Sequence, residues 1–152
     1  MSLNYLFKIR LSNKILTRIM AIVALIGVAD TVYLTTNYYF GNEIQCLITK
    51  GCEVVLTSQY SKIFSIPLML LGLIFYVGIF ILVNTLDIYQ DSRYVLKALV
   101  VGVTIGFAAS LVFLYIQLFI LKALCFYCLI SLVSSTTLFI LVAVLLKNRN
   151  KI

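Results

Sequence analysis

Four long apolar stretches constrain this chain more than any other feature of its sequence. They cover about residues 19–39, 66–86, 96–119 and 124–146. A helix needs about 20 apolar residues to cross the hydrocarbon core of a bilayer. Hydrophobic residues make up 63% of the 152 residues and charged residues only 11%, which is more apolar surface than a soluble domain of this size can bury. We therefore predict an all-α integral membrane protein, a bundle of four transmembrane helices.

The lysines and arginines lie in short groups between the apolar stretches. If the four helices are threaded in order, one side of the membrane receives Lys8, Arg10, Lys14, Arg18, Arg93, Lys97, Lys147, Arg149 and Lys151. The other side receives Lys50, Lys62 and Lys122. Cytoplasmic segments carry the excess of Lys and Arg, so we expect a multi-pass protein of the cytoplasmic (inner) membrane. Both termini are expected in the cytoplasm, and the 41–65 loop outside. The dispersed charge disfavours a nucleic-acid-binding face.

The cysteines are all predicted on that outer face. Cys46 and Cys52 lie in the first outer loop, and Cys125 and Cys128 form a C-x-x-C at the outer start of the fourth helix. The outer face is oxidising in bacteria, so disulfides form and persist there. A helix start also stabilises a thiolate through its dipole and its unpaired N–H groups. The chain has no histidine, which removes the usual general base. Any chemistry must therefore depend on thiols, hydroxyls or the few carboxylates.

Three interpretations of the cysteines are open. Two structural disulfides would give a non-catalytic membrane protein. A four-cysteine zinc site matches the number, but the spacing from Cys46 to Cys52 is wider than usual for zinc, and we expect no metal. An electron relay from a loop pair to a helix-start pair accounts for the shared face. We favour this third interpretation.

The sequence resembles the prokaryotic homologues of vitamin K epoxide reductase. The resemblance rests on ADTVYLT in the first helix, Cys46, Gly51-Cys52-Glu53, VLTSQYSKIFSIPLMLLGLIFY, and Cys125-Phe126-Tyr127-Cys128. It extends over nearly all the chain apart from the tails. It implies one membrane domain over residues 1–152, with four helices around a quinone and an outer loop that can carry a short extra helix. Many bacterial members carry a fused thioredoxin-like domain, but this chain ends just after the fourth helix, so we expect no such domain here.

The resemblance further implies an enzyme, a quinone-dependent thiol–disulfide oxidoreductase that supports disulfide bond formation. A separate thioredoxin-like protein, periplasmic or extracytoplasmic, would attack the loop disulfide at Cys46. Cys52 would then attack Cys125. Cys128 would be released as a thiolate beside the quinone, which would be of the ubiquinone or menaquinone type.

Ser58, Phe75 and Phe126 are the candidates for the quinone pocket. The resemblance assigns Ser58 a hydrogen bond to a quinone oxygen, whereas the residue by itself is equally well a helix cap or a loop hydroxyl. Aromatic side chains such as Phe75 and Phe126 also pack on bundle faces without any ligand. Asp30 lies near the outer end of the first helix, where an ionisable residue is a functional candidate. It could receive a proton, bond a neighbouring helix, or lie in the membrane interface.

Two positions depart from the pattern of the vertebrate members. Those members have Asn and Tyr where this chain has Leu68 and Leu132. The alternative function within the same family is a quinone or quinone-epoxide reductase whose main product is the reduced quinone. The two leucines argue against vertebrate-type epoxide reduction.

Overall fold

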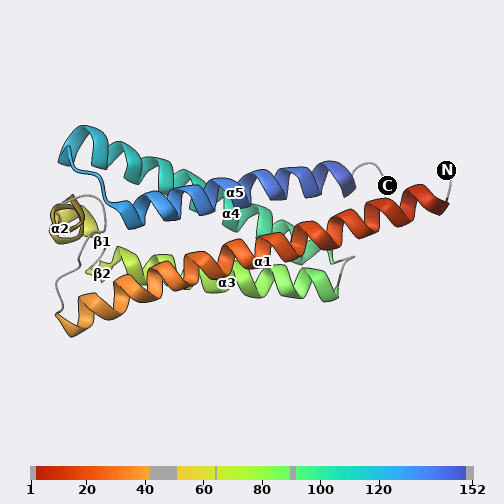
Figure 1. The fold of residues 1–152 in the computed structure, drawn as a ribbon, viewed down its shortest axis with the longest axis horizontal. Coiled ribbons are helices and arrows are strands. Elements are labelled where there is room, and N and C mark those ends of the chain that lie inside the picture. The colour runs from red at the N-terminus through yellow and green to blue at the C-terminus, as the bar shows by residue number, and fades with distance from the viewer. Residues whose placement is uncertain (1–2, 42–50, 64, 90–91, 150–152) are drawn as a thin grey trace.

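Four long helices run side by side in the computed structural model, which describes residues 3–41, 51–63, 65–89 and 92–149 (Figure 1). They are α1 (Leu3–Phe40), α3 (Leu68–Ile88), α4 (Arg93–Tyr115) and α5 (Phe126–Arg149). A π-helical turn, η2 (Ile116–Leu121), continues α4. The segments long and apolar enough to cross a membrane are Leu11–Phe40, Leu68–Ile88, Arg93–Leu121 and Phe126–Arg149. The predicted four-helix membrane bundle is confirmed.

Local sequence signals account for the ends of these helices. The first helix begins at Leu3, well before the predicted start near residue 19, because the preceding segment contains no Gly or Pro to stop it. Pro67 stands immediately before α3, and its ring holds φ at −60°. Ser92 caps α4 by accepting the N–H of Val95 at 3.5 Å.

A short helix and a small hairpin fill one end of the bundle (Figure 1). Helix α2 (Gly51–Thr57) is the extra helix expected in the outer loop, and a 3₁₀ turn, η1 (Gln59–Ser61), follows it. The unpredicted strands β1 (Lys62–Ile63) and β2 (Ile66–Pro67) then pair antiparallel. This hairpin returns the chain to the bundle where α3 begins. We call this end, which carries α2, the outer end.

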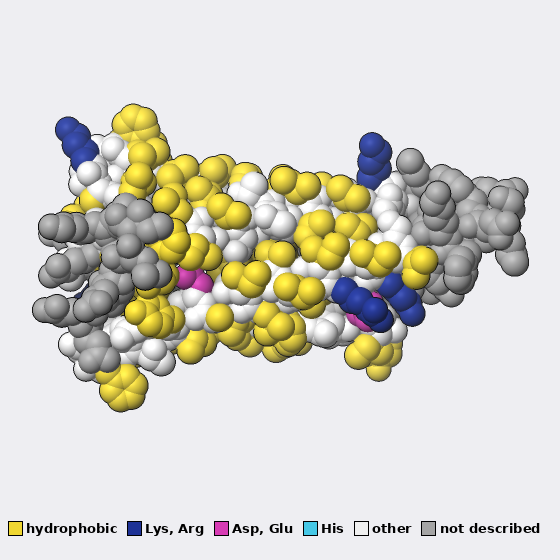
Figure 2. All heavy atoms as spheres, in the orientation of Figure 1, with side chains coloured by type: hydrophobic (Ala, Val, Ile, Leu, Met, Phe, Trp, Pro, Cys, Tyr) yellow, Lys and Arg dark blue, Asp and Glu magenta, His cyan; other side chains and the backbone are white. Residues whose placement is uncertain are grey.

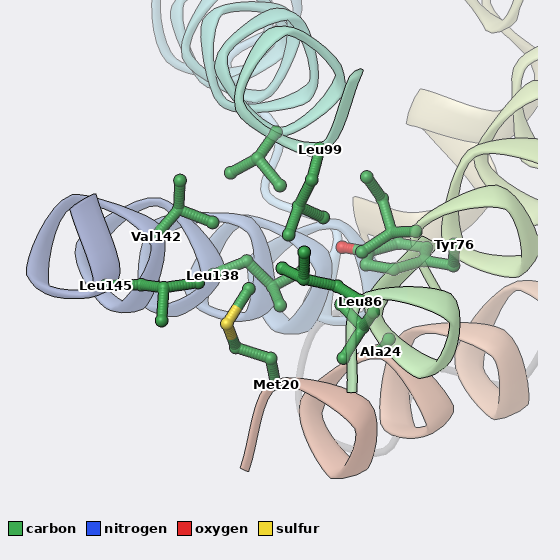
Figure 3. Packing of buried hydrophobic residues seen from close by; sticks show 11 residues of the cluster. Met20, Ala24, Tyr76, Leu86, Leu99, Leu138, Val142 and Leu145 are labelled. Carbon is green, nitrogen blue, oxygen red and sulfur yellow. The ribbon is translucent and has the colours of Figure 1, made fainter. Parts of the chain in front are cut away.

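The helices pack in a ring, in which α1 and α4 each contact both α3 and α5. The buried centre is apolar, and Figure 3 shows how its side chains meet. Hydrogen bonds also tie the helices to one another, because without water the hydroxyl groups must find partners inside the protein. Tyr76 donates to the Ser131 carbonyl, Ser135 to Ser110, and Thr17 to Asp87, each at 2.9 Å.

The outside of the bundle is also apolar. Figure 2 shows hydrophobic side chains over its middle and Lys and Arg at its two ends. Large side chains such as Ile22, Ile74, Ile105 and Val133 are more than half exposed, at 59%, 62%, 63% and 65%. A soluble protein rarely exposes so large an apolar surface, so this belt fits a surface in contact with lipid.

Candidate functional site

Cys125 and Cys128 lie at the start of α5, and both are free thiols. Cys125 immediately precedes the helix and is fully buried, and its carbonyl accepts the N–H of Leu129 at 3.1 Å. Cys128 lies one turn further along and is partly buried. The C-x-x-C therefore occupies the helix start that its sequence position predicted.

Gln117 holds this helix start in place. Its side-chain oxygen accepts the backbone N–H of Cys125 at 3.1 Å, and its backbone carbonyl accepts the N–H of Ala123, also at 3.1 Å. Between them Lys122 adopts a left-handed conformation with φ 49°, which turns the chain from η2 into α5. Sequence reasoning missed Gln117. The available signal was an isolated amide in an apolar run, eight residues before Cys125.

The environment of Cys125 favours its thiolate. The side-chain hydrogen bond with Cys128 lowers the pKa of the Cys125 thiol below its ordinary value, against the opposing effect of burial. The backbone N–H groups of Tyr127 and Cys128 lower this pKa further. This is the behaviour expected of a cysteine at a helix N-terminus, where unpaired N–H groups point toward the side chain.

Cys52 lies on α2, close to Cys125 and Cys128, which we call the inner pair. It is buried, with 1% of its surface exposed, and it is disulfide-bonded. Cys46, the other predicted loop cysteine, lies outside the described residues. Cys52 packs in a buried cluster with Cys125 at the outer end of the bundle, and Leu34 and Met69 belong to the same cluster.

Gly51 explains how α2 comes so near to Cys125. A Cβ atom at this position would lie 2.5 Å from the carbonyl oxygen and 2.9 Å from the nitrogen of Leu124. Real Cβ atoms do not approach a backbone so closely, so any larger residue would move α2 away. The glycine thus brings the helix that carries Cys52 against the residue that precedes Cys125.

A cavity of about 320 Å³ lies between the helices beside the cysteines. Residues of α1, α2, η1, α3, α4, η2 and α5 line it, and most of their side chains are apolar. Cys128 forms part of its wall, as do Tyr127 and Gln117. Cavities of this size with mainly apolar walls and a few polar groups are typical of small-molecule sites.

The predicted pocket residues are only partly brought together. Ser58 and Phe75 line the cavity. The Ser58 hydroxyl donates to the Val55 carbonyl at 2.7 Å. Ser58 immediately precedes η1 but makes no side-chain cap hydrogen bond, so its hydroxyl is that of a loop residue. Phe126 is not among the residues that line the cavity. It packs instead on the outer cluster, with its ring 5.9 Å from that of its neighbour Tyr127.

Asp30 is the acidic side chain in the cavity wall. Its Oδ2 atom is buried and has no hydrogen-bond partner among the described residues. No group of three or more Cys, Asp or Glu side chains in the described part of the chain could hold a metal ion. The polar chemistry of the cavity wall therefore centres on a thiol, a carboxyl group and a few hydroxyls.

The sequence was compared with known protein families and with curated proteins. A family model described as "Vitamin K epoxide reductase family" matches residues 18–143, most of the chain. No curated protein matches the sequence. The matched range includes the four cysteines, Asp30 and the cavity-lining segments.

Proposed function

Because the chain belongs to the vitamin K epoxide reductase family, whose members are membrane oxidoreductases that act through cysteines with a quinone, we propose that it is a quinone-dependent thiol–disulfide oxidoreductase. Its electrons come from a reduced thioredoxin-like protein outside the cytoplasm. The physiological product is the disulfide that this partner carries away. The ubiquinone or menaquinone type of lipid quinone is the proposed acceptor.

One observation carries the proposal: Cys52, Cys125 and Cys128 lie together beside the cavity. Cys52 and Cys125 belong to the same buried cluster. Cys128, three positions after Cys125 on α5, lies in the cavity wall. A set of purely structural disulfides would need neither free thiols at Cys125 and Cys128 nor a cavity beside them.

The proposed exchange begins at Cys46 and Cys52, which we call the outer pair. Cys52 is disulfide-bonded, and we propose Cys46 as its partner. A thiolate of the thioredoxin-like protein attacks Cys46, and its second thiol then completes the partner's own disulfide. Cys46 and Cys52 are left as thiols. Each exchange breaks one disulfide and forms another, so two electrons and two protons pass to this chain.

The inner pair then takes over the two electrons. The Cys52 thiolate attacks Cys125 of an oxidised Cys125–Cys128 disulfide, and Cys128 leaves as a thiolate at the cavity wall. Cys46 resolves the mixed disulfide by attacking Cys52, which restores the outer disulfide and frees Cys125. The resulting state has an outer disulfide and two inner thiols. Cys125, with its lowered pKa, is also a good leaving group for the resolving step.

The cavity fits a quinone ring. Its volume of about 320 Å³ and apolar wall suit a flat, mainly apolar molecule, and the polar atoms in the wall are few. A quinone bound here supplies a two-electron, two-proton acceptor. Phe75 offers an aromatic face, and Ser58 offers a hydroxyl that can turn from the Val55 carbonyl toward a ligand oxygen.

Leu68 and Leu132, the two positions that depart from the vertebrate pattern, both lie in the cavity wall. They present apolar side chains where vertebrate members present an amide and a phenol. Opening an epoxide requires stabilising a developing oxyanion, for which polar donors are the usual device. This favours disulfide formation over epoxide reduction as the main role.

The proposed orientation puts the outer end of the bundle on the extracytoplasmic side. The described cations of the opposite end include Lys14, Arg18, Arg93, Lys147 and Arg149, which exceed those of the outer end, Lys62 and Lys122. The excess of positive charge favours the cytoplasm for the end where α1 begins and α5 ends. The cytoplasmic membrane of a prokaryote is the proposed location.

The deciding experiment mixes the detergent-solubilised protein with a reduced thioredoxin-like protein and a soluble quinone, and follows quinone absorbance. We expect thiol-dependent quinone reduction that falls to background in Cys128→Ser. Thr137→Val is the matched control, because it lies on the same helix and its hydroxyl bonds only its own helix, at Val133. Failure of the unaltered protein to reduce quinone, with its cysteines shown to be reducible, would return us to structural disulfides.

A further inference from the structure

Asp30 is a carboxyl group that the thiol path does not use. It lies on α1 in the wall of the cavity, and its Oδ2 atom is buried with no hydrogen-bond partner among the described residues. A buried polar atom without a partner lowers stability. An ionisable side chain inside a membrane span is retained at this cost chiefly where it has a function.

The hydroxyl groups of Thr31 and Tyr76, which line the same wall as Asp30, are committed to other acceptors. Thr31, the next residue on α1, donates to the carbonyls of Gly27 and Val28 at 2.8 and 3.1 Å. Tyr76 on α3 donates to Ser131 at 2.9 Å. A residue whose role was to tie α1 to a neighbouring helix would use such donors. The open side of Asp30 is the cavity.

The titratable groups around Asp30 come from each element that packs near it. The carboxyl group interacts electrostatically with Tyr76 of α3, with Cys125, and with Tyr127 and Cys128 of α5. Tyr60 of η1 lines the same cavity. The lining residues of α4 and η2 are apolar or carry neutral hydroxyl and amide groups. Among the described residues of the wall, Asp30 is the one that carries a carboxyl group. Its charge interacts with the thiols of both Cys125 and Cys128.

The reaction needs a proton carrier in this place. When Cys125 and Cys128 are oxidised to a disulfide, two electrons and two protons leave the thiols, and the acceptor takes up two of each. The wall around the cysteines is largely apolar, so it offers few polar groups that can pass a proton on. A carboxylate next to thiols is a base of suitable strength to move one of them.

We propose that Asp30 carries a proton between the inner thiols and the quinone. The carboxylate takes the proton that a thiol of Cys125 or Cys128 loses as the disulfide forms. It then gives this proton to an oxygen atom of the quinone in the cavity and returns to the carboxylate, which carries the proton of the second thiol by the same route. No proton or electron is gained or lost by Asp30 over the cycle. This inference rests on the proposed function, since it assigns a role within that reaction.

The first test needs no quinone. Protein with cysteine labelled by carbon-13 at Cβ is titrated by NMR, and the Cys125 signal is assigned by its loss in Cys125→Ser. The charge of Asp30 raises the pKa of Cys125, so Asp30→Asn is expected to shift its ionisation to lower pH. Asp30→Glu should keep the midpoint. Asp87→Asn is the matched control, because Asp87 bonds Thr17 at the other end of the bundle and should leave the midpoint unchanged.

The second test measures single-turnover quinone reduction against pH. The rate of the unaltered protein should fall at low pH, where the carboxylate is already protonated, and Asp30→Asn should lack this acidic limb. General acid–base groups contribute roughly 100-fold or more, so Asp30→Asn should lose about this factor, and Asp30→Glu should recover most of it. Exchange between the partner and the outer disulfide should stay unchanged in all variants.

The outcomes separate the two proposals. An unaltered protein that reduces quinone, with Asp30→Asn equal to it in rate and acidic limb, overturns the role of Asp30 and leaves the proposed function intact. An unaltered protein that reduces no quinone overturns the proposed function. In that case the titration still decides whether Asp30 acts on the thiols, because an unmoved Cys125 midpoint in Asp30→Asn overturns the coupling as well.

Discussion

Single hydrogen bonds and single thiols decide what the outer end of this protein can do. The Gln117 side chain is almost fully buried, with 3% of its surface exposed, and it accepts the backbone N–H of the residue that begins the C-x-x-C. This bond fixes Cys125 at the helix start, where N–H groups of the first turn stabilise its thiolate. Asp30 brings the opposite charge effect to the same thiol. The reactivity of Cys125 is therefore set by a balance of a few identifiable groups.

Gln117→Leu should destabilise the protein by about 1–3 kcal/mol, because it leaves the buried Cys125 N–H without an acceptor. Denaturant unfolding in detergent measures the change. Thr104→Val is the control: Thr104 is exposed and its hydroxyl bonds only the Val100 carbonyl of its own helix, so the expected change is below about 0.5 kcal/mol. Equal stability of Gln117→Leu and the unaltered protein would contradict the structural role given to this amide.

Short elements, rather than the long helices, position the two cysteine pairs. Helix α2 has seven residues, too few to be stable alone in water, so its place depends on packing against the bundle. Gly51 makes that packing close by meeting the Leu124 backbone. The π-helical turn η2 and the left-handed Lys122 set where α5 begins. The distance between Cys52 and Cys125 thus depends on where packing places α2 and on where η2 and Lys122 let α5 begin.

Gly51→Ala should slow transfer from Cys52 to Cys125, because the added methyl group pushes α2 from Leu124. A misplacement of about 1 Å can cost on the order of 100-fold in rate. In a Cys46→Ser, Cys128→Ser background treated with a chemical oxidant, the disulfide of Cys52 and Cys125 can be counted by mass spectrometry, and its rate of formation should fall. Gly78→Ala is the matched control, since a Cβ there meets no atom within 4 Å. Equal rates for both alanine variants would argue against a direct Cys52–Cys125 step.

The whole molecule is an apolar bundle whose polar chemistry is concentrated at one end. Away from the outer end, the bundle has a packed core made mainly of Leu, Val, Ile and Met side chains. The outer half holds the cavity, the described cysteines and the helix α2. Bilayer thickness fixes the length of the spans. The distribution of Lys and Arg at their ends sets which end of the bundle faces the cytoplasm. The proposed function requires the cysteine end to face the compartment that holds the thioredoxin-like partner.

Single cysteines placed at the two ends test this orientation in a background without the native cysteines. Lys62→Cys lies at the outer end and Tyr94→Cys at the other end, and both positions are exposed. In intact cells a maleimide that cannot cross the membrane should label Lys62→Cys, and it should label Tyr94→Cys only after permeabilisation. The reverse pattern would place the cysteines in the cytoplasm and would contradict the proposed partner.

The number of membrane helices, their approximate positions and the shared end of Cys52, Cys125 and Cys128 followed from the sequence. The physical reason is that a span must be about 20 apolar residues long whatever its neighbours are. The same property hid most of the site. In a helix that is apolar all round, no amphipathic pattern tells which side chains face the centre. Phe126 was the predicted pocket residue, and the rotation of α5 put its neighbour Tyr127 in the wall instead.

Contacts between distant segments were decided by the tertiary structure alone. Nothing near Cys125 in the sequence marks Gln117 as its hydrogen-bond partner. Nothing near Gly51 indicates that it packs against the Leu124 backbone. The Oδ2 atom of Asp30 likewise has no partner among the described residues because the surrounding helices offer it no hydrogen-bond donor. The apolar lengths of the sequence determined a membrane bundle with its thiols at one end. Side-chain packing between helices determined the cavity, because a void depends on shapes that meet only in the folded protein.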